Sequence, residues 1–205
     1  MADVMDVSVW RHPKPPAAAV VGRCIGRTDV GVDPRKAKRL AHRLRAWARR
    51  HGTPHVVITS PLRRGADVGR WLVRWGWTHR IDARLSEVDF GAWEGQTWDA
   101  IGAAAVGAWC DDFGAHEPGG GESVRALLLR CAAFVADQRA ASAAPGACIV
   151  GHAGWISAAL WLQRANVDVD AGAGAGAGAP APAAATWPRA VGYGVRVRLR
   201  LRLRL

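Results

Sequence analysis

The sequence has no apolar run that approaches the roughly 18 residues that a membrane-spanning helix needs. Its first six residues, Met1–Asp6, hold two acids and no Lys or Arg, so they lack the basic start of a secretory signal peptide. Both absences argue against a membrane protein or an exported protein. We therefore expect a cytoplasmic protein with no membrane partner.

Closely spaced cysteines are also absent, because Cys24, Cys110, Cys131 and Cys148 lie far apart in the chain. The sequence contains neither a Cys-x-x-Cys pair nor the ligand spacing of a zinc site. We expect four reduced thiols and no metal site built from cysteine.

Acidic residues are scarce, with 17 Asp and Glu against 28 Lys and Arg, so the formal net charge is +11. The basic residues concentrate in Arg35–Arg50 and in the last ten residues, and such patches can hold polyanions. Within Arg35–Arg50, however, apolar residues recur at helical spacing, which makes the charges the solvated face of an amphipathic helix. These apolar residues are Ala37, Leu40, Ala41, Leu44, Trp47 and Ala48. We expect no nucleic-acid partner beyond nonspecific contact with the basic tail.

Short apolar runs alternate with helical patterns along most of the chain. The expected strands are Val7–Arg11, Val56–Ile58, Ile81–Ala83 and Cys148–Val150, and the expected helices are Pro34–Arg50, Pro61–Val73, Trp98–Trp109 and Ser123–Ala140. Asp33 is the expected N-cap of the first helix, with Pro34 at its first position. This alternation predicts an α/β fold, a three-layer sandwich in which helices cover both faces of a mostly parallel central sheet.

Two histidines stand where apolar runs end. His12 follows Val7–Arg11, and His152 follows Ala147–Gly151. Because open α/β sheets bind ligands at the carboxyl ends of their strands, we expect the two side chains to meet over one site. Arginines and acids follow two further runs, so the same edge of the sheet is predicted to form an anion pocket with a nucleophile and a proton donor.

Five motifs in order resemble those of the histidine phosphatase superfamily, the phosphoglycerate mutase-like proteins. They are Arg11-His12, Ser60–Arg64, Leu85–Glu87 leading into Phe90–Gly95, Gly120–Ser123, and Val150–Gly154. The resemblance covers roughly residues 7–165, with a weaker echo at Tyr193–Val197. Arg11–Pro15 followed by Cys24–Asp29 is most similar to the α-ribazole phosphatase branch, which works late in cobalamin assembly.

The resemblance assigns roles to five residues. A neutral imidazole nitrogen can attack phosphorus, which makes His12 the expected nucleophile of a phosphohistidine intermediate that needs no metal and no cofactor. Arg11 and Arg64 are the expected phosphate clamps, and a protonated His152 would add a third donor. Glu87 is the expected general acid and base.

The general acid and one phosphate-binding arginine each have an alternative candidate nearby in the sequence. Asp89 is the alternative to Glu87, and Arg63 is the alternative to Arg64. The family pattern selects Glu87, which stands two residues after a leucine and ahead of the Gly-Ala-Trp-Glu-Gly run. The same pattern places the arginine four residues after the serine, and that position is Arg64.

One departure from the family pattern concerns the phosphate pocket. The common motif has glycine after Arg-His, whereas Pro13 follows here and removes a backbone donor. We expect Lys14, Arg27 or Thr28 to complete the pocket, with Arg27 and Thr28 as candidate substrate contacts. Three tryptophans near the motifs are candidates for an aromatic wall against a ring-bearing substrate. They are Trp93, Trp98 and Trp155.

The expected domain organisation is a histidine phosphatase domain over residues 1–170, an Ala/Gly/Pro low-complexity loop over 171–185, and a C-terminal strand with an Arg/Leu tail over 186–205. Apolar and basic residues alternate from Val195 to Leu205, so the first part of this segment fits an edge strand. Successive arginines on one side make its far end an unfavourable part of a sheet core.

The sequence thus predicts a metal-independent phosphomonoesterase, with α-ribazole 5'-phosphate or a related cobalamin-pathway phosphate as the leading candidate substrate. A phosphatase of another small phosphate ester is the first alternative. A polyanion-binding protein on the same scaffold, using Arg35–Arg50 and the arginine tail, is the second.

Overall fold

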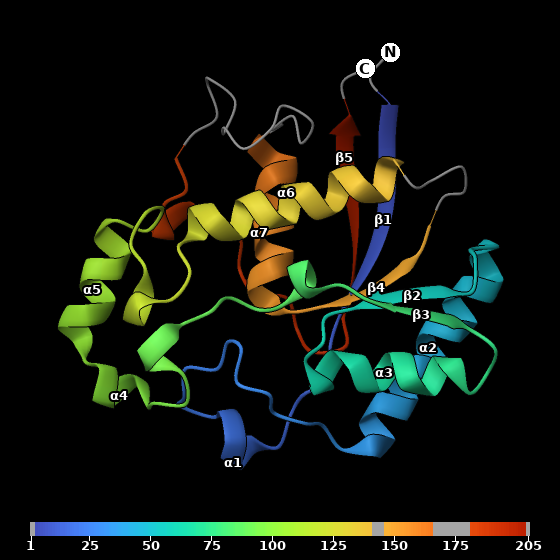
Figure 1. Ribbon diagram of the computed structural model, residues 1–205, viewed down its shortest axis with the longest axis horizontal. Coiled ribbons are helices and arrows are strands. Elements are labelled where there is room, and N and C mark those ends of the chain that lie inside the picture. The colour runs from blue at the N-terminus through green and yellow to red at the C-terminus, as the bar shows by residue number, and fades with distance from the viewer. Residues whose placement is uncertain (1–2, 141–145, 166–180, 204–205) are drawn as a thin grey trace.

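The computed structural model describes residues 3–140, 146–165 and 181–203 (Figure 1). Residues 171–180, most of the expected low-complexity loop, lie outside the described residues. The described chain contains a five-stranded sheet in the order β3-β2-β4-β1-β5. Its strands are β1 (Asp3–Arg11), β2 (Val56–Thr59), β3 (Thr78–Ile81), β4 (Cys148–Gly151) and β5 (Arg196–Leu203). β1 to β4 are parallel to one another, and β5 is antiparallel to β1.

Helices cover both faces of this sheet, which confirms the predicted three-layer α/β architecture. The helices are α1 (Ala17–Val20), α2 (Pro34–His51), α3 (Arg63–Val73), α4 (Trp98–Ile101), α5 (Ala103–Asp111), α6 (Val124–Ala140) and α7 (Ala153–Ala165). Single 3-10 turns occur at Ala83–Leu85, Gly91–Trp93, Pro118–Gly120 and Ala184–Thr186. In Figure 1, α4 and α5 lie to one side, beyond the helices that flank the sheet.

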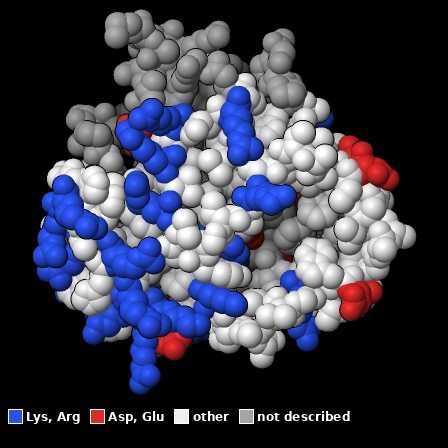
Figure 2. Space-filling model, turned by 180° about the vertical axis from the view of Figure 1, so that it is seen from behind, with Lys and Arg blue, Asp and Glu red and all other residues white. Residues whose placement is uncertain are grey.

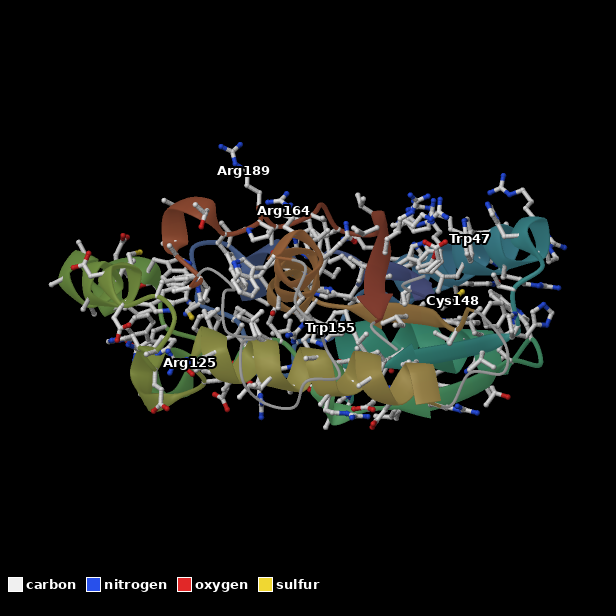
Figure 3. The ribbon with its side chains drawn as sticks, turned by 90° about the horizontal axis from the view of Figure 1, so that it is seen from above. Trp47, Arg125, Cys148, Trp155, Arg164 and Arg189 are labelled. Atoms are coloured by element: carbon white, nitrogen blue, oxygen red, sulfur yellow. The ribbon has the colours of Figure 1, made fainter. Side chains whose placement is uncertain are left out.

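Two hydrophobic clusters fill the space between the layers. Alternate residues of a strand point to opposite faces, so Val9 packs in the cluster with α6 and α7, whereas Trp10 packs in the cluster with α2 and α3. Figure 3 labels one tryptophan from each side, Trp155 of α7 and Trp47 of α2. The central strands β2, β4 and the end of β1 are thus buried, and their carboxyl ends are left to form a site.

The amphipathic helix predicted near Arg35 is α2. The Asp33 carboxylate accepts the N–H of Arg35 at 2.7 Å and caps the helix, and Gly52 ends it with φ of 61°. The predicted apolar face is confirmed, since Leu40 and Leu44 are buried with the alanines while Trp47 is half-buried. In Figure 2, basic side chains gather at the left, the side on which α2 lies after the turn from Figure 1.

Two predicted elements were wrong. The strand expected at Ile81–Ala83 lies earlier in the chain, as β3, because the Asp82 side chain accepts the N–H of Arg84 and starts a 3-10 turn. The helix expected over Trp98–Trp109 is divided into α4 and α5 at Gly102, whose φ of 84° interrupts a right-handed helix.

The edge strand expected in the C-terminal arginine and leucine segment is β5. β5 pairs with β1 from Trp10 and Arg196 to Asp3 and Leu203. Leu199 is fully buried in the cluster with α6 and α7, and Arg198 on the other side of the strand forms an ion pair of 2.7 Å with Asp6. β5 is an edge strand, as expected for the first part of this segment, and its pairing with β1 continues to Leu203.

None of the described helices is both long and apolar enough to cross a lipid bilayer.

The packing of β5 predicts the effect of truncating its buried leucine. Leu199→Ala should lower the free energy of unfolding by about 2–5 kcal/mol, because it leaves a cavity beside α7. Val195→Ala, at a 44% exposed residue just before the strand, should change it by less than about 0.5 kcal/mol. Urea denaturation of both variants measures the difference. Equal stability of the two variants would place β5 outside the core.

Candidate active site

The parallel pairing of β1 and β4 brings the two predicted histidines together. Arg11 is the register partner of Gly151, and the backbone N–H of His12 donates to the Gly151 carbonyl at 3.0 Å. His152 follows Gly151 directly, so both rings stand at the same edge of the sheet, with centroids 5.0 Å apart.

His12 is a buried, neutral ring. Its Nδ1 lies 2.8 Å from the Pro13 carbonyl oxygen, which can only accept, so Nδ1 carries the proton and Nε2 keeps its lone pair. Burial, followed by the charge of Arg64, lowers the pKa of His12 to about 3, although the Pro13 carbonyl opposes the shift. An uncharged Nε2 that has no partner among the described residues is suited to nucleophilic attack.

Pro13 therefore contributes to the site in a way that the sequence did not predict. Proline has no backbone N–H to offer a phosphate, but its carbonyl fixes the tautomer of the preceding histidine. The residue that departs from the family pattern thus orients the His12 ring.

His152 is fully buried and occupies both of its ring nitrogens. Its Nδ1 accepts from Nε of Arg64 at 3.2 Å, and its Nε2 lies 2.7 Å from Oγ of Ser60. Because a guanidinium only donates, the proton of the neutral ring is on Nε2. Burial, followed by the charges of His12 and Arg64, lowers the pKa of His152 well below its usual value. The expected role of a protonated phosphate donor remains a prediction, and the ring described here is neutral.

Arg64 holds the centre of the site. It is 2% exposed, and it donates to the Thr28 carbonyl at 2.7 Å, to the Gly26 carbonyl and to His152. These bonds engage three of the five N–H groups of a guanidinium, which leaves two to meet an anion. Arg63, by contrast, is exposed, and its backbone N–H donates to Asp29. The geometry thus favours Arg64 as the arginine that acts beside the histidines.

Arg11 is held by the C-terminal segment. Its Nη1 donates to the Val191 carbonyl at 2.6 Å, and its guanidinium lies 3.8 Å from the centre of the Tyr193 ring. The same ring is 5.5 Å from that of His12, and Gly194 donates its N–H to the Arg11 carbonyl at 3.0 Å. Tyr193 was signalled in the sequence only by the weak echo of the family pattern.

Glu87 reaches the site from the loop after the Ala83–Leu85 turn. Its Oε1 accepts the N–H of Gly154 at 2.9 Å and that of Val88 at 3.1 Å. Gly154 follows His152 by two residues, so this contact ties the expected general acid to the histidine loop. A Cβ at position 154 would collide with the carboxylate, which explains the need for glycine there.

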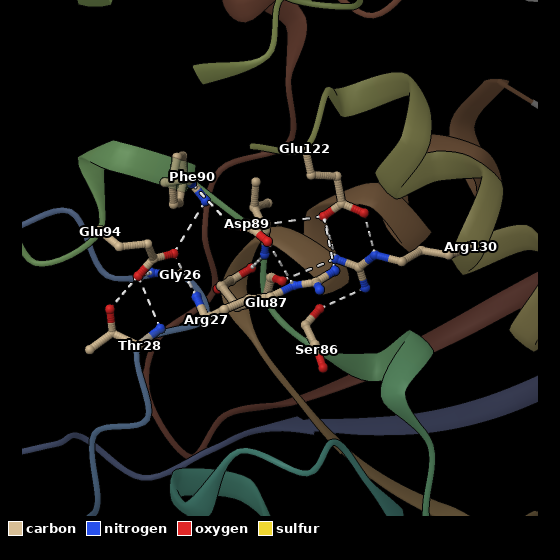
Figure 4. Close-up of polar contacts among 12 residues, drawn as sticks. Gly26, Arg27, Thr28, Ser86, Glu87, Asp89, Phe90, Glu94, Glu122 and Arg130 are labelled. Carbon is tan, nitrogen blue, oxygen red and sulfur yellow. Dashed lines mark hydrogen bonds and ion pairs between the residues drawn. The ribbon is translucent and has the colours of Figure 1, made fainter. Parts of the chain in front are cut away.

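Arg130 of α6 fixes the backbone of the Glu87 loop (Figure 4). It donates to the carbonyls of Arg84 and Ser86 at 2.7 Å each and to that of Glu87 at 3.1 Å. Its remaining N–H groups bind the Glu122 carboxylate at 2.6 and 2.8 Å. All five donors are therefore satisfied, as a nearly buried cation requires. This role was not predicted from the sequence, because an arginine in an amphipathic helix is ordinarily exposed.

Glu94 anchors the loop that binds Arg64. Its carboxylate accepts the backbone N–H groups of Gly26, Arg27 and Thr28 at 3.1, 2.7 and 2.9 Å, and that of Phe90 at 3.2 Å (Figure 4). Burial raises the pKa of Glu94, but the hydrogen bonds from Thr28, Arg27 and Phe90 outweigh it, so the pKa lies below its usual value.

The candidate substrate contacts Arg27 and Thr28 lie in this loop but not in the wall of the cavity. Thr28 directs its hydroxyl to Glu94, and the exposed Arg27 guanidinium is 3.7 Å from Asp89 and 4.0 Å from Glu122. Their contact with substrate remains a prediction. Asp89, the rival to Glu87, is engaged by Arg27 and by the N–H of Gly91 and does not line the cavity.

A cavity of about 360 Å³ joins these groups. Arg11, His12, Arg64, Glu87 and Tyr193 line one part of it, and aromatic and aliphatic side chains line most of the rest. Figure 2 shows a hollow in this face of the molecule with basic side chains at its rim. Of the three tryptophans expected near the site, Trp98 lines the cavity, Trp155 is fully buried in the core, and Trp93 is not part of the wall.

The described residues contain no group of three or more His, Cys, Asp or Glu side chains arranged to hold a metal ion.

The chain is similar to proteins of known structure over nearly its full length. A mycobacterial hydrolase is 26% identical, with coverage of 97% of this chain and 91% of that one and a TM-score of 0.72. The α-ribazole phosphatase from Shigella flexneri is 22% identical, with coverage of 98% and 95% and a TM-score of 0.72, a likeness that shows the fold alone.

Sequence comparison finds a curated relative, the glucosyl-3-phosphoglycerate phosphatase of Mycobacterium tuberculosis. It is 32% identical over 126 residues, which are 55% of this chain and 56% of that protein. The chain thus spans little more than half the length of the curated relatives it matches. The family model of the histidine phosphatase superfamily, branch 1, matches residues 7–171, and the chain therefore belongs to that superfamily.

Proposed function

We propose that the protein is a metal-independent phosphomonoesterase that works through a phosphohistidine at His12. The observation that carries the proposal is the neutral His12 ring, whose Nδ1 is tied to Pro13 and whose Nε2 is left for attack. His12 lines one cavity with Arg11, Arg64 and Glu87. This set provides a nucleophile, two cationic groups for the phosphate oxygens and a carboxyl group for proton transfer.

The reaction has two steps. Nε2 of His12 attacks phosphorus, the bond to the ester oxygen breaks, and Glu87, as general acid, gives a proton to the departing alkoxide. Water then attacks the phosphohistidine, Glu87 takes a proton from that water, and inorganic phosphate leaves with His12 restored. Arg11 and Arg64 bind the phosphoryl oxygens through both steps.

The leading candidate substrate is α-ribazole 5'-phosphate, supported by the similarity of Arg11–Pro15 and Cys24–Asp29 to that branch of the family. Under this proposal the enzyme works in the cytoplasm, in cobalamin assembly. Another small phosphate ester is the alternative, and the 32% identity to a glucosyl-3-phosphoglycerate phosphatase supports keeping it. The second alternative, polyanion binding by the basic face of α2 and β5, would not involve the cavity.

A phosphoenzyme trap tests the nucleophile. Brief incubation with labelled substrate and quenching without acid should yield a base-stable, acid-labile phosphoenzyme, and His12→Ala should abolish it. His42→Ala, at an exposed histidine of α2, is the matched control and should retain the label. A label that persists in His12→Ala would move the nucleophile elsewhere, and activity that disappears with a chelator would indicate a metal-dependent mechanism.

The two neighbouring arginines provide a test of the phosphate clamp. Arg64→Lys keeps the charge but cannot bond Gly26, Thr28 and His152 together, so turnover should fall by about 10-fold or more. Arg63→Lys should be nearly silent, because its side chain is exposed. Steady-state kinetics of both variants decides, and a larger loss in Arg63→Lys would show that the clamp is the other arginine.

A further inference from the structure

The part of the cavity away from the histidines has an aromatic wall assembled from three segments. Its five aromatic residues are Phe90, Trp98, Trp109, Phe113 and Trp187. Neighbouring rings are in contact, with centroid distances of 6.4 Å for Phe90 and Trp98 and 5.7 Å for Phe90 and Trp109. Trp109 stacks on Phe113 at 5.5 Å, and Phe113 meets the edge of Trp187 at 5.4 Å. The wall is therefore continuous.

The same wall offers few hydrogen bonds. Among the described residues that line the cavity there is no Ser, Thr, Asn, Gln or Asp. Besides Arg11, Arg64 and Glu87, the charged residue among these lining residues is Arg23, which is exposed and donates to the Gly95 carbonyl. A sugar buried there would leave several hydroxyl groups without protein partners, and each unpaired polar group carries a desolvation cost. A flat apolar ring would instead exchange water for aromatic contacts.

The wall contains one buried polar atom without a partner among the described residues. The Trp109 indole Nε1 is buried and has no hydrogen-bond partner among the described residues, and Trp109 is part of the wall. A buried indole N–H ordinarily finds an acceptor. A ring nitrogen or a single oxygen on the bound group would supply one.

The charged groups set the direction in which an ester would lie. With its phosphate against Arg11, His12 and Arg64, an ester would extend its alcohol into the rest of the cavity, which the aromatic wall and Glu87 also line. A cavity of about 360 Å³ lies within the size range of small-molecule sites.

Building on the proposed phosphatase function, we propose that this wall is a leaving-group subsite for alcohols that carry a flat, largely apolar ring. Trp98 and Trp109 are its specificity-determining residues. Such esters should be hydrolysed in preference to phosphates of simple sugars that carry no such ring, including those whose leaving group is an equally reactive primary alcohol.

Phosphonates test the subsite without catalysis, because their P–C bond is not hydrolysed. By calorimetry on the full chain, benzylphosphonate should bind about 10- to 100-fold more tightly than methylphosphonate, as expected for burial of one phenyl ring. Trp98→Ala should remove most of that ratio, and Trp98→Phe should retain it. Trp98 is 38% exposed, so its truncation should leave the core intact. Trp71→Ala on α3, remote from the wall, is the matched control and should leave the ratio unchanged.

Hydrolysis of 2-phenylethyl phosphate and glucose 6-phosphate is measured in parallel. A kcat/KM about 10- to 100-fold higher for the phenylethyl ester would support the subsite. Equal binding of the two phosphonates, or an equal loss of the ratio in Trp71→Ala, would overturn it even if both esters are hydrolysed. Selective binding of benzylphosphonate without hydrolysis of any ester would support the subsite and contradict the proposed function.

Discussion

The site depends on one buried cation, the guanidinium of Arg64. A charge that is 2% exposed must be met by hydrogen-bond partners, and here two of them are the carbonyls of Gly26 and Thr28. The backbone N–H groups of the same loop bind the carboxylate of Glu94. The Arg64 guanidinium and the Glu94 carboxylate therefore fix this loop from opposite sides. The same bonds hold the guanidinium in position to donate to His152.

The charge of Arg64 also sets the chemistry of the histidines. It adds to burial in lowering the pKa of both rings, so neither is an imidazolium in the structure described. The attraction for a phosphate dianion then comes from Arg11 and Arg64, while His12 keeps the lone pair that a nucleophile needs. Arg130 positions Glu87 by donating to the backbone carbonyls of Ser86 and Glu87. Arg64 thus holds the Gly26–Thr28 loop, and Arg130 holds the Glu87 loop.

Sequence patterns predicted the parts of this arrangement that depend on local order. The apolar runs before His12 and His152 predicted parallel strands, and parallel strands bring their carboxyl ends together, which places the rings 5.0 Å apart. Helix α2 was also predicted from local order, because Asp33 and Pro34 start the helix and Gly52 ends it through contacts with adjacent backbone. The helix expected over Trp98–Trp109 was wrong because Gly102 has a positive φ that divides it, and this φ is not visible in the sequence.

Contacts between distant residues were beyond these patterns. Arg130 binds the carbonyl of Glu87, 43 residues earlier in the sequence, and Tyr193 near the end of the sequence packs on Arg11 near its start. The aromatic wall joins α4, α5 and the C-terminal segment, whose proximity follows from the tertiary fold alone. The alternation after Val195 predicted an edge strand, but it did not indicate that the partner would be β1 or that Leu199 would be buried.

The most direct test of the account is the ionisation state of His12. In the folded protein without ligand, ¹⁵N NMR of the ring should show a neutral imidazole with its proton on Nδ1, unchanged from about pH 7 down to about pH 5, where an ordinary histidine would have become charged. This follows from the Pro13 carbonyl and from a pKa lowered to about 3. A ring that titrates near pH 6.5, or one that carries its proton on Nε2, would contradict the account.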